Sequence, residues 1–438
     1  MVSRPTTLAE PTGRRAGEAA EAGEPAEAGA RAEQPLAGIV VADFSRVLAG
    51  PLATMTLADL GARVIKVERP GSGDDTRSWG PPFTEHGSTY FASVNRSKES
   101  VALDLRDPDG LATARRLAER ADVVIENFKP GTMARLGLAY EDLVAANPGL
   151  VYCSISGFGS TGGAGLLGYD FIVQAVGGLM SITGAQGGEP TKVGVALVDV
   201  LTGKDAVIGI LAALTARART GRGDRIEVTL LTSLLGGLAN QAQAQLSVGV
   251  DPVPLGNRHP SIAPYETLHC ADGLLAVACG NDEQFGRLST ALGLSWLAAD
   301  ARFATNAARV AHRDELAGWL ESVLTTAPAA YWAETLTAVQ VPAGQVGTIG
   351  SGIALAEALG LAPTVDIGPT HAPQVRHPVS WAAYRTARAT PPPELGEHTD
   401  EVLAWLDQPR PAATDPARRR PPKRRNGRPA TTPRTDER

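Results

Sequence analysis

One aspartate, Asp199, lies where a carboxylate could do chemistry. The apolar run before it, residues 193–198, is typical of a short buried strand. After it, apolar residues recur at helical spacing up to Gly221, which predicts a long helix that begins near Val200. Because free backbone N–H groups and the helix dipole favour an anion at such a junction, we expect Asp199 to stay ionised and shielded from water. Such a carboxylate can act as a nucleophile, and the alternative is that Asp199 only caps the helix.

The segments around this junction alternate between strand patterns and helix patterns. Short apolar runs that predict strands cover 38–44, 62–68, 100–105, 122–126, 149–156 and 225–231. Helical patterns lie between most of them, so the sequence predicts an α/β fold with a Rossmann-like, mainly parallel sheet covered on both faces. A hairpin pattern at 266–279 and amphipathic helices at 284–292 and 313–325 predict a second, smaller α+β domain.

These patterns divide the chain into two domains, two linkers and two tails. The tails lack the apolar residues needed for a core, so we expect them to be disordered. The linkers are rich in Pro and Gly. The expected boundaries are 1–34 for an N-terminal extension, 35–246 for a large domain completed by 351–407, 247–264 for a linker, 265–340 for the small domain, 341–350 for the return linker and 408–438 for a basic tail.

Composition argues against several classes of protein. The 438 residues, 43% of them hydrophobic, suit a globular protein, and no run of eighteen apolar residues suggests a membrane span. The first residues have no apolar signal segment, so we expect a cytoplasmic protein. The three cysteines and seven histidines show neither CxxC nor HExxH spacing, so we expect no metal and no tightly bound cofactor. The basic tail lacks interleaved aromatic residues, so we expect no nucleic-acid partner and no membrane partner.

Several cations and amides fall at or near the predicted strand ends, where ligands of parallel sheets bind. They are Arg46, Arg69, Asn95, Arg96, Lys98, Arg106, Asn127 and Arg135. Gathered at one edge they would suit a ligand with phosphates, although each alone is also explained as ordinary surface charge. The glycine-rich run 157–168 contains a GxGxxG sequence, but no helix pattern begins on it. We therefore interpret this run as a loop that covers a site rather than as a dinucleotide-binding turn.

Residues 35–407 contain a series of different short motifs, and their order along the chain is informative. They are VADFSRVLAGP, GARVIKVERPGSGDDTR, NRSKESVALDL, ADVVIENFKPG, GYDF, VDVLTG with GILAAL and TGRGD, GNRHPSIAPYET, and LGEHTDEVL. Together they resemble the class III coenzyme A transferases, the family that includes formyl-CoA transferase and the carnitine CoA-transferase, and that is related to α-methylacyl-CoA racemase. The resemblance covers everything except the two tails.

The resemblance implies a mechanism and a set of binding residues. In this family an aspartate at the position of Asp199 attacks the acyl-CoA thioester and forms a mixed anhydride. The CoA thiolate returns to give an aspartyl-CoA thioester, and the acceptor acid takes the CoA through a second anhydride, so acyl-CoA is a substrate. Tyr169 and Asp170 would lie beside the nucleophile. The residues that would contact CoA are Val47, Leu48, Ala49, Arg69, Leu103, Arg106, Asn127, Phe128 and Arg135.

The resemblance also bears on substrates and assembly. GNRHPSIAPYET is similar to the sequence of relatives that use dicarboxylic acids, so Arg258 and His259 would bind a distal carboxylate, unless they only shape the linker. The family forms interlocked, ring-like homodimers with the active site between the large domain of one subunit and the small domain of its partner. The related racemases have a histidine at the position of Tyr169, so we favour CoA transfer to a carboxylic acid over racemisation. A non-catalytic CoA-ester binding protein is the remaining alternative.

Overall fold

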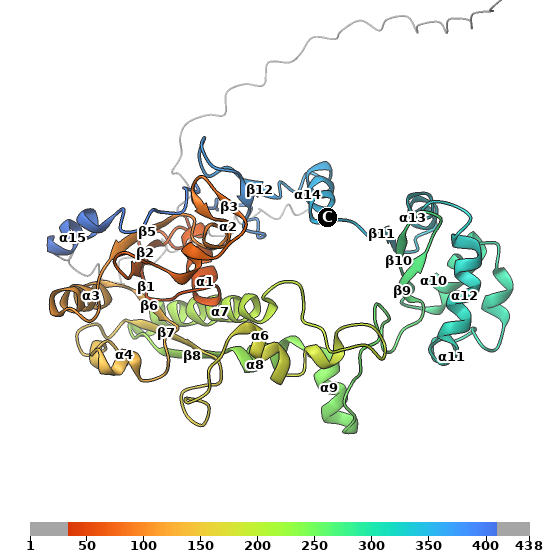
Figure 1. Cartoon of the computed structure of the whole chain (residues 1–438), viewed down its shortest axis with the longest axis horizontal. Helices are drawn as coiled ribbons and strands as arrows, with labels where there is room; N and C mark the ends of the chain where they lie inside the picture. The colour runs from red at the N-terminus through yellow and green to blue at the C-terminus, as the bar shows by residue number, and fades with distance from the viewer. Residues whose placement is uncertain (1–33, 410–438) are drawn as a thin grey trace, which may run out of the picture.

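The computed structural model describes residues 34–409. Figure 1 shows a large domain built on a sheet and a smaller domain that stands to one side of it. The tails expected to be disordered, 1–34 and 408–438, therefore lie almost wholly outside the described residues. No helix within residues 34–409 is long and apolar enough to cross a membrane.

Six strands form one sheet at the centre of the large domain, and every neighbouring pair is parallel. In spatial order they are β5 (Lys98–Ala102), β2 (Arg63–Glu68), β1 (Val40–Asp43), β6 (Val123–Glu126), β7 (Val151–Ser156) and β8 (Arg225–Thr229). Each strand corresponds to one of the six predicted runs, so the predicted α/β fold is confirmed. The chain builds the sheet outward from β1 in one direction and then returns to place β6 on the other side of β1. This reversal creates a crevice beyond the ends of β1 and β6.

Helices cover both faces of the sheet because successive residues of each strand point to opposite sides. On β1, Val41 belongs to one hydrophobic core and Ala42 to the other. The first core includes residues of α1 (Ala49–Asp59), α6 (Asp170–Val176), α7 (Leu197–Thr220) and α8 (Leu230–Gly237). The second includes residues of α3 (Pro108–Arg120), α4 (Thr132–Arg135), α5 (Tyr140–Leu143) and α15 (Thr399–Asp407).

The small domain has its own hydrophobic core. Its antiparallel sheet consists of β9 (Tyr265–His269), β10 (Leu274–Ala278) and β11 (Ala343–Gln345), so the predicted hairpin is confirmed. We expected β11 to be part of the return linker, but it pairs with β10. The helices are α10 (Asp282–Ala291), α11 (Asn306–Ala311), α12 (Arg313–Leu324) and α13 (Ala329–Ala338), of which the sequence patterns indicated α10 and α12. Between the two domains the chain forms α9 (Ala239–Val248) and α14 (Ile349–Ala358).

The strand predicted just before Asp199 is absent, and that prediction is wrong. Residues 193–196 form no ladder, and α7 already begins at Leu197. The backbone N–H of Val193 donates to the side-chain oxygen of Gln174 at 2.9 Å, so a side chain takes the place of a neighbouring strand. A short apolar run can lead into a helix as readily as it can form a strand, because its periodicity does not distinguish the two.

Candidate active site

A carboxylate from another segment caps the helix that carries Asp199. Asp170 is the first residue of α6, and its Oδ1 accepts the backbone N–H groups of Val198 at 2.8 Å and Asp199 at 3.3 Å. Gln174 lies one turn later on α6, and its side-chain Nε2 donates a hydrogen bond to Oδ2 of Asp170 at 2.6 Å. Asp199 itself lies inside the first turn of α7, so the interpretation of Asp199 as the cap is wrong. The predicted pair of Asp170 and Asp199 is nevertheless brought together.

Asp199 has an unexpected property. Burial, together with the negative charge of Asp170, raises the pKa of Asp199 to about 7. The helix end therefore does not keep the pKa of Asp199 low, contrary to our expectation, and two of its backbone N–H groups bind Asp170 instead. A buried carboxylate with a raised pKa is more basic than a solvated one, which suits a nucleophile.

The position of Asp199 follows from how α7 packs on α1. Residues four apart share a face of a helix, so Asp199 lies one turn above Gly203. A Cβ atom at Gly203 would approach the carbonyl oxygen of Ala49 to 2.7 Å, so the two backbones touch at this point. Asp199 therefore lies one turn of α7 away from the contact with Ala49, the first residue of α1, which follows the turn 45–48. These residues include the predicted CoA contacts Val47, Leu48 and Ala49.

An aromatic residue that the sequence did not indicate lies near the two carboxylates. Tyr90 belongs to the short helix α2 (Thr89–Ala92), and the ring of Trp79 packs edge-on against it at 5.2 Å. Burial raises the pKa of Tyr90 to about 12, and the charges of Asp199, Asp170 and Asp74 add to this effect. The phenol therefore keeps its proton and can donate a hydrogen bond. Segment 75–92 has no long apolar period, so no sequence signal marked this residue.

Tyr169 lies directly before Asp170 but is open to solvent. It is the N-cap residue of α6, and 59% of its surface is exposed. The glycine-rich run before it closes on itself, because a Cβ atom at Gly157 would lie 2.7 Å from the Cα atom of Gly168. No helix begins within this run, which agrees with our interpretation that it is no dinucleotide-binding turn. Its role as a cover stays a prediction.

A pocket of about 380 Å³ opens beyond the ends of β1, β2, β5 and β6. Of the predicted CoA contacts, it is lined by Arg69, Leu103, Arg106 and Phe128. Arg135 stands beside it, bonded to the hydroxyl of Thr132 in its lining at 3.0 Å. Arg46 adds a further cation, since its guanidinium stacks over Phe128 at 5.4 Å and its Nε has no hydrogen-bond partner among residues 34–409. The pocket can hold a phosphate-bearing ligand.

Asn127 joins two loops at the crevice between β1 and β6. Its side-chain oxygen accepts the backbone N–H of Arg46 at 2.8 Å, and its side-chain nitrogen donates to the carbonyl oxygen of Arg46 at 2.7 Å. The structure thus shows Asn127 orienting the loop after β1, and a contact with CoA stays a prediction.

Three residues expected at the basic edge of the sheet are buried instead. Arg96 pairs with Asp59 at 2.6 Å, and Lys98 lies 3.2 Å from Asp43 and 2.8 Å from Asn95. The expectation is wrong because β5 begins at Lys98, so these residues precede a strand rather than follow one.

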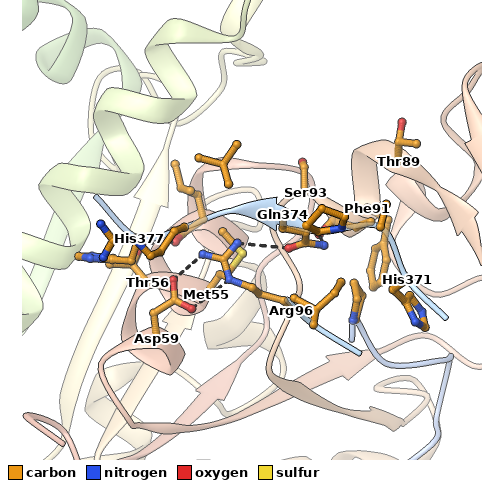
Figure 2. Close-up of a pocket in the computed structure, with 18 of the residues that line it drawn as sticks. Met55, Thr56, Asp59, Thr89, Phe91, Ser93, Arg96, His371, Gln374 and His377 are labelled. Carbon is orange, nitrogen blue, oxygen red and sulfur yellow. Dashed lines mark hydrogen bonds and ion pairs between the residues drawn. The ribbon is translucent and has the colours of Figure 1, made fainter. Parts of the chain in front are cut away.

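A second, larger cavity of about 1,070 Å³ lies along α1 and α7. Figure 2 shows how Arg96 crosses its floor, bonded to Asp59 and, at 3.2 Å, to Gln374. The residues of 367–379 close one side, and Val200, the neighbour of Asp199, lines another. The cavity therefore reaches the helix that carries the predicted nucleophile.

Arg258 and His259 lie with the small domain. Arg258 pairs with Glu266 at 3.0 Å and Asp314 at 2.6 Å, whereas its Nη2 has no hydrogen bond recorded among residues 34–409. His259 donates its backbone N–H to the carbonyl oxygen of Tyr265 at 3.0 Å and packs against that ring. Within one chain, the structure shows no contact between this pair and Asp199.

Comparison with known proteins identifies the family. The model of CoA-transferase family III matches residues 36–399. Succinate–glutarate CoA-transferase of Agrobacterium fabrum is 46% identical over 388 residues, which cover 85% of this chain and 96% of that protein. Succinyl-CoA:glutarate CoA-transferase of Mus musculus is 41% identical, covering 84% of this chain and 86% of that protein. The crystal structure of a CAIB/BAIF family protein from Brucella suis gives a TM-score of 0.77 at 46% identity, covering 85% of this chain and 100% of that one. The resemblance seen in the motifs is confirmed: the chain belongs to CoA-transferase family III and is a class III CoA-transferase.

Proposed function

We propose that this enzyme moves CoA from an acyl-CoA donor to a dicarboxylic acid, with Asp199 as the nucleophile. The observation that carries the proposal is the raised pKa of the partly buried Asp199, whose backbone N–H is bound by Asp170 at the start of α7. The relatives named above are transferases, which favours transfer over the racemase and the non-catalytic alternatives.

The proposed reaction keeps the energy of the thioester in covalent bonds. An oxygen of Asp199 attacks the thioester carbonyl carbon, the C–S bond breaks, and a mixed anhydride and CoA thiolate form. The thiolate attacks the Asp199 carbonyl carbon of the anhydride, which releases the donor acid and leaves an aspartyl-CoA thioester. The acceptor carboxylate repeats the two steps in reverse and leaves with CoA. Dividing one transfer into these steps replaces a difficult direct exchange by easier displacements.

In this proposal CoA extends from the 380 Å³ pocket, which holds its nucleotide, to Asp199. Arg46, Arg69 and Arg106 of the 380 Å³ pocket, together with Arg135 beside it, would bind the nucleotide phosphates. The turn 45–48 would then lead the chain of CoA toward Asp199. Tyr90, which keeps its proton, is placed to donate a hydrogen bond near the reacting carboxylates.

The acceptor is proposed to be a dicarboxylate. The Agrobacterium fabrum and Mus musculus relatives are named for succinate and glutarate, and a relative from Acetobacter aceti, 44% identical over 71% of this chain, is named acetyl-CoA:oxalate CoA-transferase. Succinate, glutarate and oxalate each have two carboxylates. Arg258 supports this proposal, because its Nη2 is available for the second carboxylate of the acceptor.

A second copy of the chain would complete the site. Helices α9 and α14 bury none of their residues, and they expose Leu246 to 80% and Ile349 to 87%. Helices that leave large apolar side chains such as these exposed are typical of an interface between subunits. We therefore propose the interlocked homodimer, in which the small domain of the partner brings its Arg258 toward Asp199.

The first prediction concerns the covalent intermediate. After incubation with an acyl-CoA donor, hydroxylamine should convert Asp199 to a hydroxamate that peptide mass spectrometry locates. Asp199→Asn should lower turnover by roughly 10⁴-fold or more, the scale on which enzymes lose rate without such a group. Donor binding, measured by calorimetry, should persist.

A stability measurement is the control for this variant. Because the folded-state pKa of Asp199 is raised, the free energy of unfolding of the wild type falls as pH rises from about 4 to about 7. Asp199→Asn should therefore melt no lower than wild type at pH 8, and turnover retained in this variant would refute the mechanism.

The second prediction concerns pH. Since only ionised Asp199 attacks, kcat/KM for the donor should fall as pH drops through about 7 and level off above it. Asp170→Asn keeps an oxygen for the helix N–H groups but removes the like charge, so it should move the midpoint to lower pH. Asp205→Asn, an exposed carboxylate farther along α7, is the matched control and should leave the midpoint in place. If the midpoint of the pH profile is the same in Asp170→Asn as in wild type, the charge of Asp170 does not raise the pKa of Asp199.

The third prediction concerns the acceptor. A mass-spectrometric screen should find that dicarboxylic acids accept CoA faster than monocarboxylic acids of equal length. Arg258→Gln should raise KM for the dicarboxylate about tenfold or more, the cost of a charge-assisted hydrogen bond. Arg302→Gln, which breaks an exposed ion pair elsewhere in the small domain, should not. Equal use of both classes of acid would exclude the dicarboxylate proposal.

The fourth prediction concerns assembly. Sedimentation at successive dilutions should show a dimer that does not dissociate, because interlocked chains can separate only by unfolding. A folded monomer with transferase activity would contradict this proposal.

A further inference from the structure

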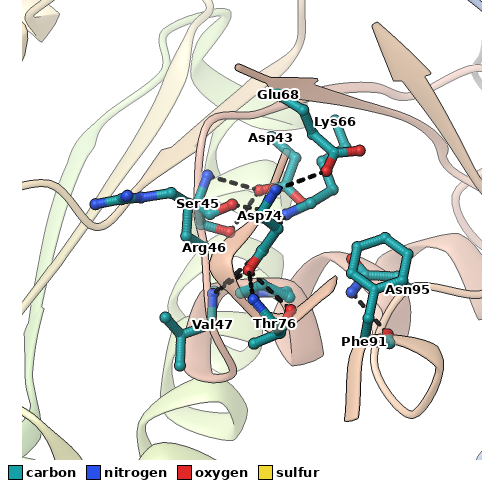
Figure 3. Close-up of polar contacts among 12 residues, drawn as sticks. Asp43, Ser45, Arg46, Val47, Lys66, Glu68, Asp74, Thr76, Phe91 and Asn95 are labelled. Atoms are coloured by element: carbon teal, nitrogen blue, oxygen red, sulfur yellow. Dashed lines mark hydrogen bonds and ion pairs between the residues drawn. The ribbon is translucent and has the colours of Figure 1, made fainter. Parts of the chain in front are cut away.

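The turn before α1 contains a valine in an unfavourable backbone conformation. Val47 has φ of 71°, the left-handed region that a β-branched side chain seldom adopts. A residue stays in this region only when its surroundings hold it there. The backbone N–H of Val47 points at the carboxylate of Asp74, 3.3 Å from each oxygen, as Figure 3 shows.

One buried ion pair holds both sides of this turn. Asp74 and Lys66 have completely buried side chains and pair at 2.9 Å. Lys66 also donates to the carbonyl oxygen of Ser45 at 2.8 Å. The pair therefore binds the backbone of residues 45 and 47, on either side of Arg46, whose own backbone is fixed by Asn127.

A second buried pair holds the adjoining helix. Asp43 accepts hydrogen bonds from the backbone N–H of Ser45 at 2.9 Å and from Thr54 of α1 at 2.6 Å. Lys98 lies 3.2 Å from Asp43 and donates to the carbonyl oxygen of Pro51 at 3.0 Å. The turn and the first turns of α1 thus rest on the same group of buried charges.

Stability alone does not explain why these charges are buried. Replacing a buried ion pair by apolar residues of similar volume is often neutral or stabilising, because desolvation opposes the attraction between the charges. Apolar side chains, however, cannot bind a backbone N–H and a backbone carbonyl oxygen. Burial raises the pKa of Asp74, but Lys66 and the hydrogen bonds from Thr76 outweigh it and hold this pKa below its usual value. Asp74 therefore remains an acceptor at neutral pH.

We propose that Asp74 and Lys66 are positioning residues, which hold Val47 in its left-handed conformation and so fix residues 47–49 relative to Asp199. The proposal rests on the proposed function, in which residues 47–49 contact CoA. Without the tether, Val47 would relax to negative φ and redirect the chain just before α1. The first residue of α1, Ala49, abuts Gly203 of the nucleophile helix, so such a change would shift the turn beside Asp199.

Kinetics with a matched pair of variants test the proposal. Asp74→Asn should lower kcat/KM for acyl-CoA by about 100-fold, the effect of a misplacement of about 1 Å, while KM for the acceptor acid stays unchanged. Glu99→Gln removes a carboxylate from the ion pair with Arg63, which lies at the opposite end of β2, and should leave both constants near wild type. Thermal melting will check that both variants are folded. If Asp74→Asn leaves kcat/KM for acyl-CoA unchanged, or if Glu99→Gln lowers it equally, the proposal is wrong.

A rescue experiment separates positioning from a direct effect of charge. Glycine adopts positive φ without strain, so the turn needs less restraint in the Val47→Gly background. The loss of kcat/KM for acyl-CoA caused by Asp74→Asn should therefore be clearly smaller in the Val47→Gly background than in wild type. An equal loss in both backgrounds would show that Asp74 does not act through the conformation of Val47.

Hydrogen exchange distinguishes failure of this proposal from failure of the proposed function. Peptide-level exchange over residues 44–52 should accelerate in Asp74→Asn and remain slow in Glu99→Gln, whether or not any donor is turned over. Accelerated exchange in an enzyme without transferase activity would support the positioning role and overturn the proposed function. Unchanged exchange in Asp74→Asn would overturn the positioning role alone.

Discussion

At the start of α7, the backbone N–H groups of Val198 and Asp199 both donate to the carboxylate of Asp170. They are therefore not available to the side chain of Asp199. This single interaction decides the chemistry of its neighbour. Asp199 remains at the helix end but without free donors, close to a like charge and largely shielded from water. The helix would otherwise have lowered the pKa of Asp199, whereas the arrangement in the structure raises it. A carboxylate that is poorly stabilised before the reaction gains more by forming a bond to carbon.

The sheet brings the remaining parts of the site to this point. The reversal between β1 and β6 places two loops at one crevice, and Asn127 binds them to each other. The three arginines that line the neighbouring pocket come from three different connections of the sheet. The close approach of α1 and α7 then brings the residues after β1 toward the helix that carries Asp199, the proposed nucleophile. Each binding residue thus depends on the order of the strands as well as on its own position.

Much of this architecture could be predicted from the sequence because the six strands are short apolar runs bounded by turns. The errors have a common physical cause, which is that distant segments supply polar partners. The run at 193–198 was predicted as a strand, but Gln174 binds its backbone. Asp199 was considered as a cap, but Asp170 provides the cap. Lys98 was expected at the surface, but Asp43 makes its burial possible. Tyr90 belongs to no periodic segment, and only the folded chain brings it near the carboxylates.

The contact between Gly203 and Ala49 limits how the enzyme can move. The backbones of the two helices touch at this point and the side chain of Leu52 packs beside the contact, so a relative movement of α1 and α7 here would require their backbones to shift. In the proposed mechanism, the movement that admits the thioester and then excludes water would therefore come from the glycine-rich run 157–168 and the small domain rather than from this contact.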